Sequence, residues 1–296
     1  MPLLLTLLSL GLLLILWGVL VERNRFTVAR QELGILNPGS KPIRVLHISD
    51  LHVAPWQKRK LAWISKLSEL EPDLIVNTGD NLGHRDAIRP TLEALSSLMK
   101  VPGVFVNGSN DYHAPEIRNP ASYLNKPSTP NHKELIDSSK LTDSFEASGW
   151  KNLNNLSASL VIGGNRIGFL GLDDPHDQLA KFETLAKQQT ELGAPELVVG
   201  VAHAPYLKVI EEFGAHGAHL VFAGHTHGGQ ICLPGIGAIV TNCDLPAKKA
   251  KALSEHQVQN RTVWLNVCAG LGTSIFAPIR LFCAPEVRLL TLTARS

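Results

Sequence analysis

The chain opens with twenty residues that carry no charge, from Pro2 to Val21. An apolar helix of about 20 residues covers the roughly 30 Å hydrocarbon core of a bilayer, so this stretch predicts a transmembrane anchor over residues 1–22. A cleaved signal peptide is the alternative, but a basic leading region and a small-x-small cleavage site are both missing. Arg23, Arg25 and Arg30 follow the span. By the positive-inside rule they favour a single-pass membrane protein with its main domain on the cytoplasmic side.

Strand and helix patterns alternate after the anchor. Residues 23–42 are predicted to be a linker, in which "RFTVARQEL" alternates like a first strand and "LNPGSKP" is rich in turn formers. The pattern that follows reads strand, helix, strand, helix, strand, which favours parallel strands covered by helices. These elements are expected over residues 43–49, 58–70, 73–78, 86–100 and 103–107.

Strands become denser in the second half of the chain. A segment with four prolines, residues 114–131, separates the halves, and a loop of this length is usually functional or disordered. We expect strands over residues 158–162, 166–172, 196–202, 219–223, 262–267 and 287–293, with helices over 132–147, 177–192 and 206–213. The pattern predicts one α/β domain over residues 43–296.

Composition limits the classes of partner. An apolar content of 44% fills a large core, and a net charge of +2 with both signs scattered leaves no basic groove, so nucleic acid is not expected as a partner. The four cysteines lie in the last quarter without a CxxC pair, and we expect them to be buried as small apolar side chains. No pattern in the chain specifies an oligomeric state.

Metal-competent side chains follow nearly every predicted strand. In open α/β sheets, functional groups gather at the carboxyl ends of the strands, so groups far apart in the sequence can converge there. Each motif alone also fits a capped turn or a surface histidine, and their common placement is what predicts a site. The motifs are Asp50-Leu51-His52, Gly79-Asp80, Gly108-Ser109-Asn110-Asp111, His203 and Gly224-His225-Thr226-His227.

In this order the motifs resemble those of the calcineurin-like metallophosphoesterase superfamily, from about Ile43 to Leu292. The apolar N-terminus together with "GLDDP" (residues 171–175) is similar to the membrane-associated bacterial branch that is likened to UDP-2,3-diacylglucosamine hydrolases. The resemblance implies a four-layer α/β/β/α sandwich, preceded here by one transmembrane helix.

The resemblance also implies two divalent metal ions bridged by Asp80. Carboxylates and neutral imidazoles suit Mn, Fe or Zn, and a hydroxide bridging two such ions attacks phosphorus. One ion would be held by Asp50, His52, Asp80 and His227, and the other by Asp80, Asn110, His203 and His225.

The third motif departs from the family's Gly-Asn-His-Asp/Glu string. Aligned without a gap, Ser109 takes the place of the metal-binding Asn; shifted by one residue, Asn110 does. We favour Asn110 because an amide oxygen is a better ligand than a serine hydroxyl. The family's histidine is missing from its place in either register, so Asp111 or His113 is the expected proton donor.

These features predict a two-metal phosphoester hydrolase, with phosphodiesters favoured over monoesters. The anchor suggests a lipid-linked or membrane-proximal substrate. The alternative is a non-catalytic metal-binding scaffold of the same fold, since one fold hosts many functions.

Overall fold

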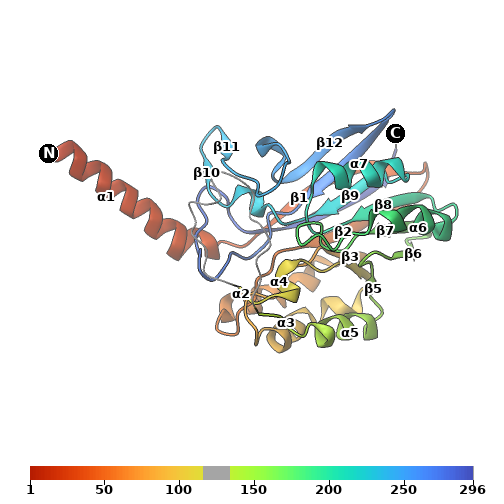
Figure 1. Ribbon diagram of the computed structural model, residues 1–296, viewed down its shortest axis with the longest axis horizontal. Helices are drawn as coiled ribbons and strands as arrows, with labels where there is room; N and C mark the ends of the chain where they lie inside the picture. Colours follow the sequence, from red (N-terminus) through yellow and green to blue (C-terminus); the bar gives the residue numbers. More distant parts are fainter. Residues whose placement is uncertain (116–133, 296) are drawn as a thin grey trace.

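The computed structural model of the chain describes residues 1–115 and 134–295, which form two facing six-stranded sheets (Figure 1). The first sheet is parallel except where β14 meets β2, and the second is parallel except at its two edge pairs. The strand order of the first is β1 (Thr27–Leu36), β14 (Glu286–Ala294), β2 (Ile43–Ile48), β3 (Leu74–Asn77), β4 (Gly103–Phe105) and β5 (Lys151–Asn152). The order of the second is β12 (Ala252–Val258), β13 (Arg261–Val267), β9 (Leu220–Ala223), β8 (Leu197–Val201), β7 (Asn165–Gly171) and β6 (Ser157–Ile162).

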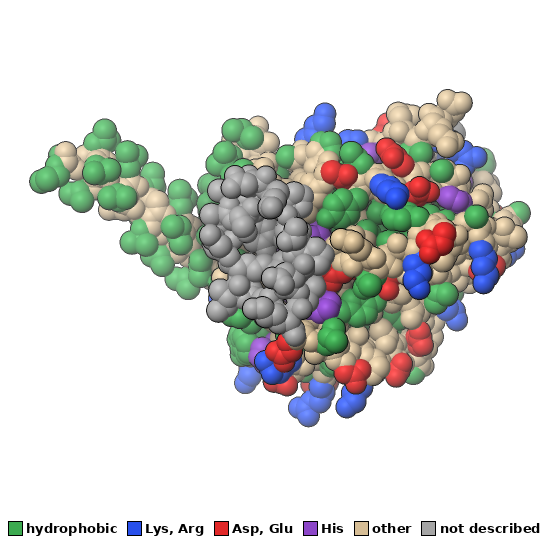
Figure 2. Space-filling model, viewed as in Figure 1, with side chains coloured by type: hydrophobic (Ala, Val, Ile, Leu, Met, Phe, Trp, Pro, Cys, Tyr) green, Lys and Arg blue, Asp and Glu red, His purple; other side chains and the backbone are tan. Residues whose placement is uncertain are grey.

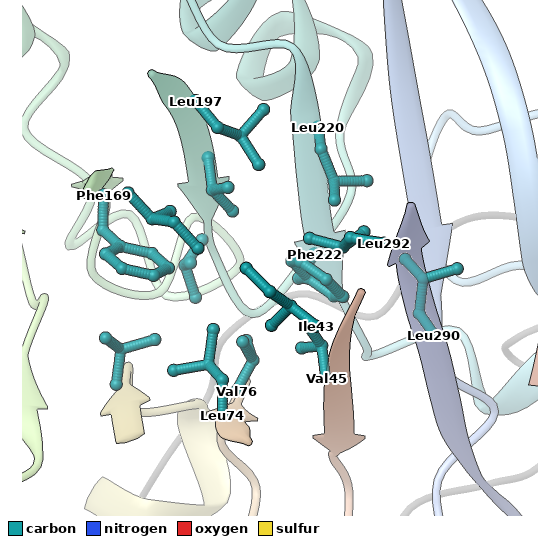
Figure 3. Packing of buried hydrophobic residues seen from close by; sticks show 14 of the residues in the cluster. Ile43, Val45, Leu74, Val76, Phe169, Leu197, Leu220, Phe222, Leu290 and Leu292 are labelled. Atoms are coloured by element: carbon teal, nitrogen blue, oxygen red, sulfur yellow. The ribbon is translucent and has the colours of Figure 1, made fainter. Parts of the chain in front are cut away.

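Alternate residues of these strands fill the space between the sheets. Ile43 and Val45 of β2 meet Phe222 of β9 in one buried cluster (Figure 3), while Leu46 and Ile48 point to the opposite face. A strand buried on both faces must be apolar on both, which is why these strands read as continuous apolar runs.

Helices cover the outer faces of both sheets. The first sheet packs against α2 (Lys58–Ile64), α3 (Ile88–Leu95) and α5 (Ser139–Ala147), and the second against α6 (Leu185–Leu192) and α7 (Leu207–Ala215). Short helical turns are η3 (Leu67–Leu70), η4 (Leu98–Lys100), α4 (Ser109–Tyr112), η6 (Phe182–Thr184), η7 (His227–Gly229) and η8 (Ala247–Lys249). The chain therefore has a mixed α/β fold with two sheets and flanking helices.

Several predicted boundaries differ from the structure. The helix expected over 132–147 begins at Ser139, and the one expected over 177–192 begins with η6 at Phe182. The sequence does not predict strand β12, because this strand lies at the edge of its sheet and its sequence, "ALSEHQV", has no apolar run. The structure does not describe residues 116–133, which include most of the proline-rich segment expected over residues 114–131.

The N-terminal segment is helical from Pro2 to Asn24, through α1 (Pro2–Leu16), η1 (Trp17–Val21) and η2 (Glu22–Asn24). It projects from the domain, and hydrophobic side chains cover it (Figures 1 and 2). It is long and apolar enough to cross a membrane, a property that signal sequences share. Strand β1 lies in the segment expected to be a linker and pairs with β14.

Candidate metal centre

Loops at the carboxyl ends of the parallel strands bring the predicted ligands to one edge of the two sheets. Donor atoms of Asp50, His52 and His227 all lie within 4.8 Å of one another, and so do those of Asp50, Asp80 and His203. Five of the seven predicted ligands thus form two overlapping clusters, each large enough for one metal ion.

Asp80 lies between the histidines of the two clusters. Its Oδ2 is 3.4 Å from His52 Nε2 and 3.6 Å from His203 Nε2. His52 Nε2 lies 3.2 Å from His227 Nε2, which is itself 3.5 Å from Asp50 Oδ1. The Oδ2 atom of Asp80 thus lies near one histidine of each cluster, while the carboxylate that belongs to both clusters is that of Asp50.

Burial sets the charge of these groups. It lowers the pKa of His52 and of His227 well below the ordinary value, so both imidazoles are neutral, the form that binds metals. Burial also raises the pKa of Asp50 and of Asp80, because little water reaches their carboxylates. A divalent cation between these groups would offset the cost of burying the two carboxylates.

His203 is held in one orientation by the backbone. Its Nδ1 donates to the Thr78 carbonyl oxygen at 2.7 Å, and its buried Nε2 has no hydrogen-bond partner among the described residues. Burial lowers its pKa, but the carboxylates of Asp80 and Asp50 outweigh burial and raise the pKa to about 10. His203 therefore carries a positive charge that balances the two carboxylates. A bound cation could take over this role in place of the Nε2 proton. A backbone partner on the other ring nitrogen is typical of metal-binding histidines.

The backbone is strained at most of the predicted ligands. Left-handed backbone costs about 1–3 kcal/mol for a residue with a side chain, and such residues cluster at functional sites. The φ angles are 47° at Asp50, 38° at His52, 54° at Asp80, 67° at His225 and 50° at His227. The fold therefore holds these side chains at a cost in stability.

Gly108 lets the third loop approach the site. A Cβ at this position would collide with Asp80 Oδ1 and with the ring of His203. The next turn, α4, follows directly, so the glycine brings the backbone of this loop against the bridging carboxylate.

Asn110 contacts the predicted bridge. Its backbone N–H donates to Asp80 Oδ1 at 2.8 Å and its Nδ2 donates to Asp80 Oδ2 at 2.7 Å. Rotation of the amide by 180° would turn Oδ1 toward a cation held by Asp80. The Ser109 carbonyl oxygen accepts from the His113 backbone N–H at 2.9 Å, which closes the turn of α4. The Asn110 side chain thus contacts Asp80, and its role as the ligand in place of Ser109 stays a prediction.

His225 lies beside the clusters rather than within them. Its ring centroid is 5.3 Å from that of His203, and its backbone N–H donates to Asp50 Oδ2 at 3.0 Å. Its Nε2 faces the Asn242 carbonyl oxygen at 3.2 Å. A donor of His225 toward metal would therefore be Nδ1.

The two predicted proton donors have different surroundings. Asp111 is fully buried, and its carboxylate accepts hydrogen bonds from the backbone N–H groups of Gly108, Asn81 and Leu82. Burial raises the pKa of Asp111 to about 7. His113 is partly exposed, and its Nε2 lies 3.4 Å from Asp177 Oδ2. The hydrogen bonds of Asp111 support the loop, and the role of either residue in proton transfer stays a prediction.

Arg280 is a supporting residue that the motifs did not indicate. Its buried guanidinium donates to the carbonyl oxygens of His227 at 2.8 Å and of Gly272 at 2.7 Å, and Nη2 lies 3.3 Å from His227 Nδ1. It therefore fixes the loop that carries His227. One feature of the sequence could have pointed to a buried role for Arg280. It is the one charged residue between residues 267 and 285.

Asp174 is a buried carboxylate that was not among the predicted site residues. It is fully buried, its Oδ1 accepts from the His176 backbone N–H at 2.8 Å, and its Oδ2 has no hydrogen-bond partner among the described residues. Burial raises its pKa to about 8. Its signal is the "GLDDP" segment, which follows strand β7.

Comparison with known proteins agrees with this geometry. The family model of calcineurin-like phosphoesterases matches residues 43–229, more than half of the chain, and this range contains every predicted metal ligand. The chain belongs to the calcineurin-like phosphoesterase family. Divalent metal ions and hydrolase activity are thus supported for it.

Two relatives come from Bacillus subtilis (strain 168). The uncharacterized protein YpbG is 27% identical over 259 residues, which cover 86% of this chain and 82% of YpbG. The uncharacterized metallophosphoesterase YkuE is 25% identical over 283 residues, which cover 92% of this chain and 86% of YkuE. Among solved structures, the NAD nucleotidase NadN of Haemophilus influenzae matches 78% of this chain and 51% of its own, with 13% identity and a TM-score of 0.45.

Proposed function

We propose that the protein is a two-metal phosphoester hydrolase that acts on phosphodiesters at a membrane surface. The observation that carries the proposal is the pair of overlapping donor clusters in a chain of the phosphoesterase family. The clusters share the buried carboxylate of Asp50, and Asp80 lies within 3.6 Å of a histidine nitrogen of each. Two bound divalent cations supply Lewis acidity at the phosphoryl oxygens and lower the pKa of a water molecule. The side chains of the protein would hold these cations and orient the substrate.

The proposed ligands divide around Asp80. Asp50, His52 and His227 hold one cation and Asn110, His203 and His225 the other, with the Asp80 carboxylate shared by both. The shared carboxylate offsets the repulsion between the cations. The contacts of Asp80 with His52, His203 and Asn110 support this division.

The charges beside the site favour diesters. Burial is the main cause of the lowered pKa of His52, and the nearby cations Lys60 and Arg280 lower it further. Lys60 donates to the carbonyl oxygens of Leu51 and His52, and Arg280 donates to those of the His227 loop. Both side chains are buried and donate to backbone carbonyl oxygens, and Arg280 Nε has no hydrogen-bond partner among the described residues. Neither is proposed to bind a second phosphoryl charge. A singly charged diester fits this arrangement better than a doubly charged monoester.

His113 is the proposed proton donor to the leaving oxygen. The carboxylate of Asp177 lies 3.4 Å from Nε2 and orients the ring. Asp111 holds the preceding loop, so loss of Asp111 would act through Asn110 and not through proton transfer.

The proposed substrate is lipid-linked or held near a lipid surface. The N-terminal helix is proposed to cross the membrane once, with the domain on the cytoplasmic side. A catalytic centre fixed at the membrane meets lipid headgroups at high local concentration.

The test is hydrolysis by the full chain in detergent micelles with Mn²⁺. We expect turnover of bis(p-nitrophenyl) phosphate and about two equivalents of metal per chain. A well-folded chain that binds no metal and hydrolyses no phosphoester would contradict the proposal and favour a scaffold role. Phosphatidylglycerol and its soluble headgroup analogue then compare lipid with soluble diesters.

A further inference from the structure

Two largely apolar segments lie at the base of the N-terminal helix. Residues 230–241, which contain the hairpin of β10 (Cys232–Leu233) and β11 (Gly237–Ala238), carry no charge, and residues 267–283 carry only the buried Arg280. The segments touch, because Gln230 Nε2 donates to the Ala277 carbonyl oxygen at 3.1 Å and Cys232 N–H donates to that of Leu281 at 2.8 Å. Figure 1 shows the hairpin on the side of the domain from which α1 projects.

Large apolar side chains are exposed on these segments. Each of these side chains is at least 44% exposed, whereas large apolar side chains of the core are buried. An exposed group of this kind marks a surface that contacts a partner or a membrane. We call the group the apolar platform: Leu233, Ile236, Ile239, Phe276 and Phe282.

The helix is fastened to the same segments. The Arg280 backbone N–H donates to the Gly18 carbonyl oxygen at 3.3 Å, and a Cβ at Gly18 would collide with Ile279. The buried carboxylate of Glu22 accepts from the Cys283 backbone N–H at 2.7 Å and from Trp17 Nε1 at 3.2 Å. The helix therefore leaves the domain at a fixed angle and at a fixed height relative to the platform.

This junction sets the depth of the platform. Gly18 lies three residues inside the uncharged span that ends at Val21, which is about 4.5 Å along a helix. The loop that packs on Gly18 must then lie at the level of the headgroups when the span is in the bilayer. Trp17, at the same level, is the residue type that favours the membrane interface.

We propose that the apolar platform inserts into the headgroup region of the bilayer that the N-terminal helix crosses. The inference rests on the membrane placement proposed above. Its occupant is lipid, because the exposed apolar side chains of the platform lie at the base of the apolar span, and the charges between them, Glu22 and Arg280, are buried. The platform segments also carry Arg280 and Gly272, which contact His227, so the metal centre lies directly behind the lipid contact.

A fluorescent label tests the lipid contact in the full chain. Cys243, the one cysteine that is not buried, is changed to serine, and Ile236→Cys is labelled with nitrobenzoxadiazole. Val161→Cys is the matched control: Val161, on strand β6 of the second sheet, is 70% exposed, and Ile236 is 74% exposed. Both proteins are placed in phosphatidylcholine nanodiscs with and without a lipid that carries a nitroxide near its headgroup.

We expect the nitroxide lipid to roughly halve the emission at position 236 and to leave that at position 161 unchanged. Equal, unquenched emission at both positions would overturn the proposal. A shielded label at 236 that the nitroxide lipid does not quench would also overturn it, since protein would then cover the platform. Failure of the chain to enter nanodiscs would overturn it together with the membrane placement, while hydrolysis in micelles tests the proposed activity separately.

Discussion

The two sheets contribute different chemistry to their common edge. The loops after β2, β3 and β4 bring mainly oxygen donors, those of Asp50, Asp80 and Asn110, whereas the loops after β8 and β9 bring imidazoles. His52 is the exception, since it lies in the loop after β2. Its Nε2 is 3.2 Å from Nε2 of His227, which follows β9. If these side chains hold cations as proposed, the first sheet would supply the negative charge that retains them, and the second would supply imidazole donors that fix their positions.

Loss of Asp80 should have the largest effect. Asp80→Asn removes the charge proposed to be shared by both cations, so we expect both metal equivalents to be lost. The rate should fall by about 10⁴-fold or more, equivalent to roughly 5.5 kcal/mol of transition-state stabilisation. Metal analysis and initial rates on bis(p-nitrophenyl) phosphate measure these effects. Two retained metals with normal turnover would mean that Asp80 does not bridge.

Loss of one imidazole should be smaller and more local. His203→Ala removes a ligand of only one proposed cation, so we expect one metal equivalent to remain and the rate to fall by about 10³-fold. The same measurements apply, with circular dichroism to confirm folding. If this variant loses both metals as Asp80→Asn does, the proposed difference between the sheets is wrong.

His113 should matter only for difficult leaving groups. Replacement by Asn removes the proposed proton donor, and we expect a loss of about 10²-fold on a phenyl diester. A p-nitrophenyl diester should be hydrolysed almost normally, because its leaving group needs no proton. Equal losses on both substrates would instead indicate a structural role.

The smallest effect concerns the register of the third loop. Asn110→Ala should weaken the second metal and lower the rate about tenfold, since an amide is one neutral donor among several. Ser109→Ala is the matched control and should keep both. If the serine variant alone loses metal, the gapless alignment is correct.

Much of the fold follows from local patterns. The buried strands are apolar on both faces, so β2, β3 and β8 can be predicted from their apolar runs. Strand β12 could not, because one face of an edge strand meets water and its apolar signal is weak. The helix that begins at Ser139 is shorter than its pattern because helix ends depend on tertiary contacts.

The candidate site follows from the position of its motifs after strands, and the structure brings Asp50, His52, Asp80, His203 and His227 together. Their roles as ligands stay predictions. Arg280 could not be placed from the sequence, because it acts through carbonyl oxygens that only the folded chain brings within reach. The two apolar segments of the platform can be recognised in the sequence, but their contact with the N-terminal helix cannot be predicted from it.

Asp80 is proposed to join two cations where the sheets meet. A crystal structure of the full chain grown with Mn²⁺, with anomalous scattering at the manganese edge, tests this bridge directly. We predict two anomalous peaks about 3.5–4 Å apart, with one Asp80 oxygen near each or one oxygen between them. A single peak, no peak, or two peaks bridged by Asp50 would contradict it.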